Sequence, residues 1–379
     1  MIVKSLTQRG IPNSEAAGSI NRIDNRPDKM VSRPRVLRVH NTESTYWDYE
    51  TAPYVRFIRE DVVSSMLKRG LCGFTGAATP GEAWRKIMPT YEKGDVIAVK
   101  PNLNALHLGY ARNIDVTPTV INSVVGSLIE DLGVPSKNIC VYDLCADAGL
   151  IRGILKYPVA CVGRFTSSLY DRLKMHLQMG PNAFDSSAVI NLRHPVHDKE
   201  GNPVFCYVPK VLTHADHLIN IPAFKAHQFI LTSSALKNHF GTVRFSNYSQ
   251  YPVDLHGKGL QSHIVDINLN KHVIEKTRIN IVDALFGAPL YGYNSYGRLP
   301  TPWQTFPKDK TPNSLIFSSD TVALESIVGD YIVKEQRHHN VESGPHHYLH
   351  LAAEAGLGVH EHRKDDGSYE IIDYREIEV

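Results

Sequence analysis

Residues 95–144 read DVIAVKPNLNALHLGYARNIDVTPTVINSVVGSLIEDLGVPSKNICVYDL, and this stretch indicates the fold. The apolar runs at 95–103 and 138–144 have the length of buried strands. Between them, Thr117 and Pro118 form a cap and first-turn pair that predicts the start of a helix. Apolar residues then repeat at helical spacing up to Gly133, at Val120, Val124, Leu128 and Leu132. A strand, a helix and a second strand in this order predict a unit with parallel strands.

The same alternation continues on both sides of this unit. Further strands are predicted at 187–194, 216–224, 278–285 and 314–320. A helix is predicted from Pro53 to Arg69, followed by Gly70, and another is predicted to begin after a cap at Asp320. The sequence therefore predicts an α/β fold with a mainly parallel sheet and helices on both faces, which is a Rossmann-like sandwich.

The domain organisation follows from composition. Residues 1–34 are polar without periodicity and are predicted to form an extended arm, whereas 35–379 are predicted to form one large domain. A loop-rich insertion is expected around 180–210, with a hairpin at DKEGNP. The Gly-, Pro- and aromatic-rich segment 287–313 is interpreted as a lid over a pocket, with a disordered loop as the alternative.

Composition excludes several classes of function. The 379 residues hold 41 Lys and Arg against 39 Asp and Glu, so the net charge is only +2, and no nucleic-acid partner is expected. No apolar run approaches the ~18 residues of a membrane helix, so no membrane partner is expected either. A cytoplasmic location is predicted, with export after removal of a leader as the alternative. Because GxGxxG and P-loop patterns are absent, neither NAD nor a nucleotide is expected.

Histidine and cysteine are informative in different ways. The 19 histidines suggest metal or proton chemistry, and a divalent metal ion is the cofactor that this excess would serve. The five cysteines match no zinc or iron–sulfur spacing, so they are interpreted as mostly buried thiols and no cluster is expected. His346, His347 and His350 have helical spacing. We interpret them as a partly exposed helix face, with a metal pair as the alternative.

Polar residues follow almost every predicted strand. Ligands of open parallel sheets bind beyond the carboxyl ends of the strands, so these positions are candidates for a site, although each alone would suit a cap or turn. The predicted substrate-binding residues are Asn102, Asn104, Asp143 and Asp283, and the predicted catalytic residues are Lys100, Lys225, His227, Lys237 and Asn238. The predicted metal ligands are His239, His256 and His263.

Residues 221–245, IPAFKAHQFILTSSALKNHFGTVRF, hold most of these candidates. They are predicted to begin as a strand and to continue as a helix from Ser233 or Ser234 to Gly241. Cations in a last helical turn are favoured by the helix dipole, which gives a purely structural explanation. The functional alternative is a set of donors and one general base around an anion.

The ordered landmarks resemble those of the DUF362 family, named as a domain of unknown function. They include VIAVKPNLN, DVTPTVINSVV, PAFKAH, ALKNHFG and FSSDTVALES, and the resemblance spans roughly residues 90–360. The chain departs from the family pattern by Ala226 in place of threonine, His239 in place of an apolar residue and Thr321 in place of proline. The resemblance implies an α/β sandwich. Some relatives carry ferredoxin-type cysteine motifs, but this chain has none.

Three functional hypotheses follow. The first is an enzyme that acts on a small anionic, carboxylate-bearing substrate, with Lys and Asn side chains holding the anion and His227 transferring a proton, with or without a metal. The second is a non-catalytic metal- or ligand-binding protein. The third is a subunit that docks a partner through the Tyr-rich loop 287–300, and a homo-oligomer is compatible with the same sequence.

Overall fold

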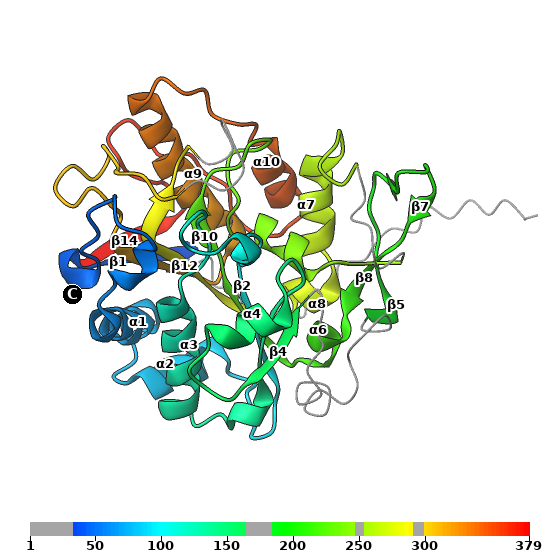
Figure 1. The fold of residues 1–379 in the computed structure, drawn as a ribbon, viewed down its shortest axis with the longest axis horizontal. Helices are drawn as coiled ribbons and strands as arrows, with labels where there is room; N and C mark the ends of the chain where they lie inside the picture. The colour runs from blue at the N-terminus through cyan, green and yellow to red at the C-terminus, as the bar shows by residue number, and fades with distance from the viewer. Residues whose placement is uncertain (1–32, 164–183, 247–253, 291–298) are drawn as a thin grey trace, which may run out of the picture. The chain divides into compact units, whose positions relative to one another are not determined.

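The computed structural model describes residues 33–163, 184–246, 254–290 and 299–379. Within these ranges, nine strands form one sheet in the order β14-β1-β13-β12-β9-β2-β3-β4, and β10 pairs with β12 (Figure 1). These strands are β1 (Arg35–His40), β2 (Ile97–Pro101), β3 (Ile139–Asp143), β4 (Ala160–Gly163), β9 (His217–Ile221), β10 (Ala223–Lys225), β12 (Thr277–Ala288), β13 (Ser314–Ser318) and β14 (Asp373–Glu378). The strand pairs from β12 through β4 are parallel, and β13 is antiparallel to both of its neighbours.

Helices cover both faces of this sheet. α1, α2 and α3 pack together on one face, whereas α9, α10 and α7 lie on the other (Figure 1). The described α-helices are α1 (Glu60–Thr75), α2 (Pro80–Ile87), α3 (Pro118–Glu130), α4 (Ala148–Gly153), α6 (Lys210–His214), α7 (Leu260–Asn268), α8 (Lys271–Ile274), α9 (Thr321–His338) and α10 (His347–Glu354). Short 3-10 helices are η1 (Thr42–Ser44), η2 (Tyr54–Arg56), η3 (Leu106–Leu108), η4 (Ser136–Asn138) and η5 (Lys237–Thr242). The predicted α/β architecture with a mainly parallel sheet is confirmed.

The predicted helix ends are partly right. The Thr117 hydroxyl accepts a hydrogen bond from the Val120 amide at the start of α3, and Asp320 caps α9 by accepting from two backbone amides. The helix predicted from Pro53 instead begins at Glu60, after η2, and it continues past Gly70.

Gly70 serves helix packing and does not end the helix. A Cβ atom at this position would lie 2.4 Å from the Phe317 ring of β13, so the missing side chain lets α1 approach the sheet closely. The helix ends at Gly76, which adopts a left-handed conformation with φ of 66°. A glycine after an apolar repeat can therefore indicate close packing as well as a helix end.

The helix predicted from Ser233 to Gly241 is wrong, because only the 3-10 helix η5 forms there. The backbone amides that precede it bind outside the segment: Ser233 donates to the Lys225 carbonyl, and Leu236 donates to the buried Glu325 carboxylate of α9. Thr232 donates its hydroxyl to the same carboxylate. These long-range hydrogen bonds hold residues 226–236 in an irregular path beside the carboxyl ends of the strands.

The insertion forms small antiparallel sheets of its own. β5 (Phe184–Ile190), β8 (Cys206–Pro209) and β11 (Arg244–Phe245) make one, so the strand predicted at 187–194 lies outside the main sheet. β6 (Val196–His197) and β7 (Pro203–Val204) pair around the predicted turn, which confirms the hairpin. The insertion's first residues, 180–183, lie outside the described ranges.

Two other predicted segments are described only in part. Residues 1–32 of the predicted arm and residues 291–298 of the predicted lid lie outside the described ranges. Within the lid segment, Trp303 is buried and stacks on Phe224 with ring centroids 5.1 Å apart. Trp303 thus contributes to the core.

Candidate functional site

The carboxyl ends of β2, β3 and β10 bring together charged side chains that are far apart in the sequence. Lys100 is the last but one residue of β2, Asp143 is the last residue of β3 and Lys225 is the last residue of β10. All three side chains are almost completely buried. Burial of charges is unfavourable unless they are paired, so their partners determine what the site can do. We call the site formed by Lys100, Asp115, Asp143, Cys145, Lys225, His227, Lys237 and His256 the strand-end site.

The Lys100 ammonium group donates all of its hydrogen bonds to partners within the protein. Its Nζ donates to Asp143 Oδ2 at 3.0 Å, to Asn238 Oδ1 at 3.1 Å and to the Pro101 carbonyl at 2.9 Å. Asp143 in turn accepts from the backbone amides of Leu103 and Cys145. Every donor of the ammonium is used, so these hydrogen bonds hold the Lys100 side chain in one position at the buried end of the site.

Gly241 allows this ion pair to approach η5. A Cβ atom at Gly241 would lie 2.4 Å from Asp143 Oδ1 and 2.8 Å from Lys100 Nζ. Its carbonyl also accepts from the Leu144 amide at 2.9 Å, which holds η5 against the end of β3. The glycine of ALKNHFG is therefore explained by the buried ion pair beneath it.

Replacing Gly241 with alanine is expected to destabilise the fold by about 1–3 kcal/mol, because the added methyl group overpacks the ion pair. Gly153→Ala in α4 is the matched control, since a Cβ there meets no atom within 4 Å and only helix propensity changes. Denaturant midpoints measure both effects. Equal midpoints for Gly241→Ala and the wild type would show that the close approach has no energetic role.

Lys225 pairs with an aspartate that the sequence reasoning gave no role. Its Nζ lies 3.5 Å from Asp115 Oδ1, and it donates to Asn104 Oδ1 at 2.8 Å and to the Ile114 carbonyl at 3.0 Å. Burial lowers the pKa of Lys225, whereas burial raises the pKa of Asp115 to about 7 against the opposing charge of Lys225. Burial drives both shifts, and the opposite charge of each partner opposes the shift of the other, so pairing offsets part of the cost of burying the two groups.

Lys237 differs from the other two lysines of the site in its partners. It is 7 % exposed, and within the described ranges no carboxylate lies at ion-pair distance from it. Its Nζ lies 3.0 Å from His256 Nε2 and 3.4 Å from the centre of the Phe240 ring. Burial, reinforced by the charge of Lys225, lowers the pKa of Lys237 to about 7. Near neutral pH, the charged and the neutral form of this amine are therefore both populated.

Two neutral imidazoles accompany Lys237. His227 and His256 stack with ring centroids 5.7 Å apart and an interplanar angle of 11°. Burial and the neighbouring Lys237 lower the pKa of His227 to about 2 and that of His256 to about 3. His227 Nδ1 accepts from the Phe229 amide at 3.1 Å, so the proton of its neutral ring is on Nε2. Both side chains are half-buried, and they form the accessible rim of the site together with the exposed Asn104.

Cys145 is the second member that the sequence reasoning missed. It follows Asp143 by two residues and is half-buried. Burial and the Asp143 carboxylate raise the pKa of its thiol to about 12, against the charges of Lys100 and Lys237. The side chain is therefore a neutral thiol near neutral pH. Its position just beyond a strand end was the signal that could have identified it.

Several predicted residues have structural partners. Asp283 accepts from the backbone and hydroxyl of Thr117 at 2.7 Å, so it joins β12 to the start of α3. Asn238 donates to the Lys100 carbonyl and to Asn220, and so positions the ion pair. Asn102 donates to the Ser233 carbonyl at 3.4 Å, and its Oδ1 is buried with no hydrogen-bond partner in the described ranges.

The three predicted metal ligands are not brought together. His239 is buried against Thr242, with Nδ1 3.2 Å from the hydroxyl. His263 directs both ring nitrogens at backbone carbonyls, those of Leu255 and His194. Only His256 reaches the strand-end site. In the described ranges, the histidine, cysteine and acidic side chains that converge as a metal site would require are His346, His350 and His362.

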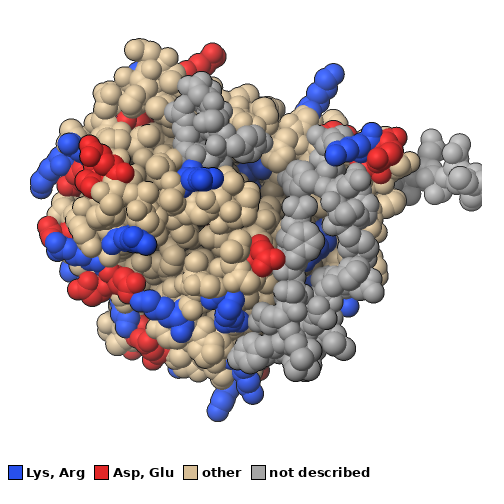
Figure 2. Space-filling view, viewed as in Figure 1, with Lys and Arg blue, Asp and Glu red and all other residues tan. Residues whose placement is uncertain are grey.

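The surface charge agrees with a small local site. Figure 2 shows basic and acidic side chains interspersed over the visible, described part of one face, without an extended patch of one sign. The side chains of Lys100, Lys225 and Lys237 lie in the interior. No helix in the described ranges combines the length and apolar character needed to span a bilayer.

Comparison with known proteins identifies the family. A search of curated proteins finds no match. The model of the family described as a domain of unknown function, DUF362, matches residues 97–330. This range covers more than half of the chain, runs from β2 into α9 and includes every member of the strand-end site. The chain therefore belongs to the DUF362 family.

Proposed function

We propose that this protein is an enzyme that acts on a small carboxylate-bearing substrate by general acid/base chemistry at the strand-end site. The observation that carries this proposal is Lys237, a buried amine without a carboxylate partner in the described ranges. Burial of an unpaired ammonium is destabilising. An anionic substrate would supply the missing partner.

The charges around Lys237 favour a reaction that moves a proton. Lys100 and Lys225 each have a carboxylate partner within the protein, in Asp143 and Asp115. Lys237 is therefore the amine that remains to hold the substrate carboxylate. The neutral rings of His227 and His256 lie beside it, at the half-buried rim. A general base must be neutral before it accepts a proton, and it works best when its pKa lies near the operating pH. The negative charge of a bound carboxylate would raise the lowered pKa of His227 toward that range. Lys100, Asn238 and Asp143 act as positioning residues in this proposal.

Binding of a carboxylate is expected to depend on pH with a defined sign. The charged form of Lys237 binds the anion, and its pKa is lowered to about 7 in the free protein. Affinity should therefore be constant well below pH 7 and weaken about tenfold per pH unit above it, with proton uptake on binding. Calorimetric titration of malonate in buffers of different ionisation enthalpy measures both quantities. Affinity that does not change between pH 6 and pH 9 contradicts the role of Lys237.

His227→Ala is expected to abolish turnover, with a loss of about 100-fold or more, without lowering the thermal midpoint. Because the product is unknown, the assay is exchange of carbon-bound hydrogen for deuterium in 2-oxo, 2-hydroxy and dicarboxylic acids, followed by NMR. His338→Ala, an exposed position on α9, is the control and should exchange at the wild-type rate. Retained exchange together with a large loss of stability would assign His227 a structural role.

The alternative is a binding protein that holds a carboxylate without transforming it. The lowered pKa values of both imidazoles also suit this function, because neutral rings donate and accept hydrogen bonds without adding charge. Stoichiometric, pH-dependent binding of a carboxylate without exchange or turnover on the same panel would favour the alternative.

A further inference from the structure

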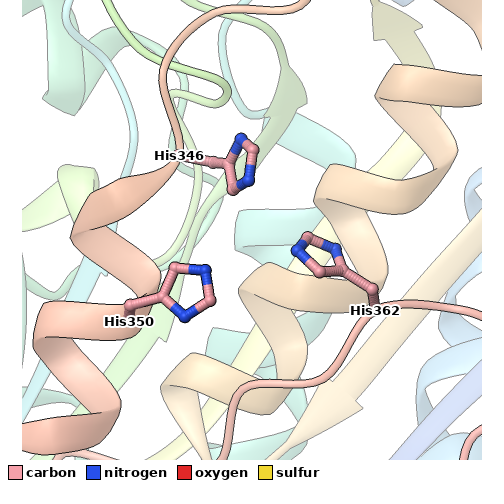
Figure 3. A group of neighbouring side chains, drawn as sticks. All are labelled: His346, His350 and His362. Carbon is pink, nitrogen blue, oxygen red and sulfur yellow. The ribbon is translucent and has the colours of Figure 1, made fainter.

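A second group of histidines lies beyond the residues that match the family. His346 directly precedes α10, His350 follows one turn later on that helix, and His362 lies in the segment that returns along α9. One ring nitrogen from each comes within 4.8 Å of the other two. Figure 3 shows the three rings directed into one space between α10 and the returning segment. We call these residues the histidine triad.

Local structure explains why the triad converges. The four-residue separation of His346 and His350 puts both rings on one side of α10. The returning segment is held against α9 at two places. The Val359 amide donates to the Asp320 carboxylate, and the Arg363 amide donates to Asp330 Oδ2 at 2.9 Å. The third ring is thus presented by backbone hydrogen bonds, independently of the helix.

Neighbouring groups resemble the outer sphere of a metal centre. Asp330 Oδ1 lies 3.5 Å from His362 Nδ1, and a carboxylate on one ring nitrogen orients the other toward a metal. His360 packs edge-to-face on His350 and His362, with ring centroids 4.5 and 4.6 Å away. Its Nδ1 is hydrogen-bonded to Ser326, but its Nε2 is buried and has no hydrogen-bond partner in the described ranges. Buried polar atoms normally have a hydrogen-bond partner, and this exception lies directly beside three converging imidazoles.

We propose that the histidine triad binds one divalent transition-metal ion through three imidazole nitrogens, leaving at least one coordination position open. Imidazole ligands suit zinc, copper and nickel, whereas calcium and magnesium require oxygen ligands. Three neighbouring histidines without a metal would also repel one another when protonated. The site is separate from the strand-end site and does not depend on the function proposed there.

Metal binding would also have a structural consequence. The ion would join the start of α10 to the returning segment. Between the two triad positions of α10, Tyr348 points inward, and its hydroxyl lies 3.1 Å from Glu325 Oε1 and 3.0 Å from the Thr232 hydroxyl. Glu325 holds the irregular segment that leads to Lys237. The ion would therefore stabilise the support of the strand-end site without contacting a substrate.

The test is calorimetric titration of Zn²⁺ into the full chain, with His346→Ala and His347→Ala as a matched pair. Both remove an imidazole from the same dipeptide, but His347 is not in the triad. We expect one ion per chain, affinity at least about tenfold weaker in His346→Ala, His350→Ala and His362→Ala, and unchanged affinity in His347→Ala.

X-ray absorption of the zinc-loaded wild type gives an independent measurement that needs no variant. We expect three imidazole nitrogens at about 2.0–2.1 Å from the metal. The proposal is overturned if His346→Ala and His347→Ala bind Zn²⁺ with equal affinity, or if the spectrum contains fewer than three imidazole ligands.

Discussion

Replacing Lys100 with methionine is expected to destabilise the fold by about 3–5 kcal/mol, the usual effect of removing one partner of a buried ion pair. The variant leaves the Asp143 carboxylate buried without its ion-pair partner, although the backbone amides of Leu103 and Cys145 still donate to it. It also leaves Asn238 Oδ1 without its donor. Urea unfolding followed by circular dichroism measures the free energy of unfolding.

An exposed ion pair is the control for this loss. Lys364 and Glu370 are 2.9 Å apart with side chains 49 % and 72 % exposed, so Lys364→Met should leave the midpoint unchanged. The double variant Lys100→Met with Asp143→Leu should recover much of the lost stability, because it removes both buried charges. Equal free energies of unfolding for Lys100→Met and Lys364→Met would show that the buried ion pair of Lys100 and Asp143 does not stabilise the strand-end site.

Replacing Lys237 with methionine is expected to have the opposite effect and to stabilise the fold. The wild-type amine has its pKa lowered from 10.5 to about 7 by burial. Below pH 7 the lysine is protonated in both the folded and the unfolded chain, and folding must bury the ammonium, so the full cost is present. Between about pH 7 and pH 10.5 only the unfolded chain binds this proton, and the stability of the wild type therefore rises with pH.

The size of this effect follows from the pKa shift. Near pH 6, Lys237→Met should be more stable than the wild type by on the order of 5 kcal/mol, and the advantage should shrink toward pH 10. Thermal unfolding of both proteins across this range measures it. Lys225→Met is the matched control, because Lys225 has a carboxylate partner in Asp115 and its loss should destabilise. Destabilisation by Lys237→Met at pH 6 would contradict the claim that the protein itself leaves this amine unpaired.

The fold was largely predictable because buried strands and amphipathic helices have strong periodic signals. The strands that carry Lys100 and Asp143 near their ends were found from the sequence, as were the caps at Thr117 and Asp320. Other features depend on tertiary contacts. Gly70 did not end a helix because its missing side chain accommodates Phe317, a contact between residues far apart in the chain.

The candidate site was most readily predicted where a charged side chain lies at the end of an apolar run. Lys100, Asp143 and Lys225 met this condition and lie together. Asp115 was missed because it lies in the loop before α3, where no strand ends. The grouping of His239 with His256 failed because closeness in sequence does not determine which way a side chain points from a 3-10 helix. The interpretation of His346 and His350 as only an exposed helix face omitted His362, which the returning segment brings beside them.

The ionisation of Lys237 tests the central claim most directly. Lysine side chains labelled with ¹³C at Cε report protonation by NMR, and the Lys237 signal is identified by its loss in Lys237→Arg. We expect a midpoint near pH 7 in the free protein, and a higher midpoint when malonate supplies the missing negative charge. A midpoint near 10.5, the ordinary value for lysine, that does not move with malonate would contradict it.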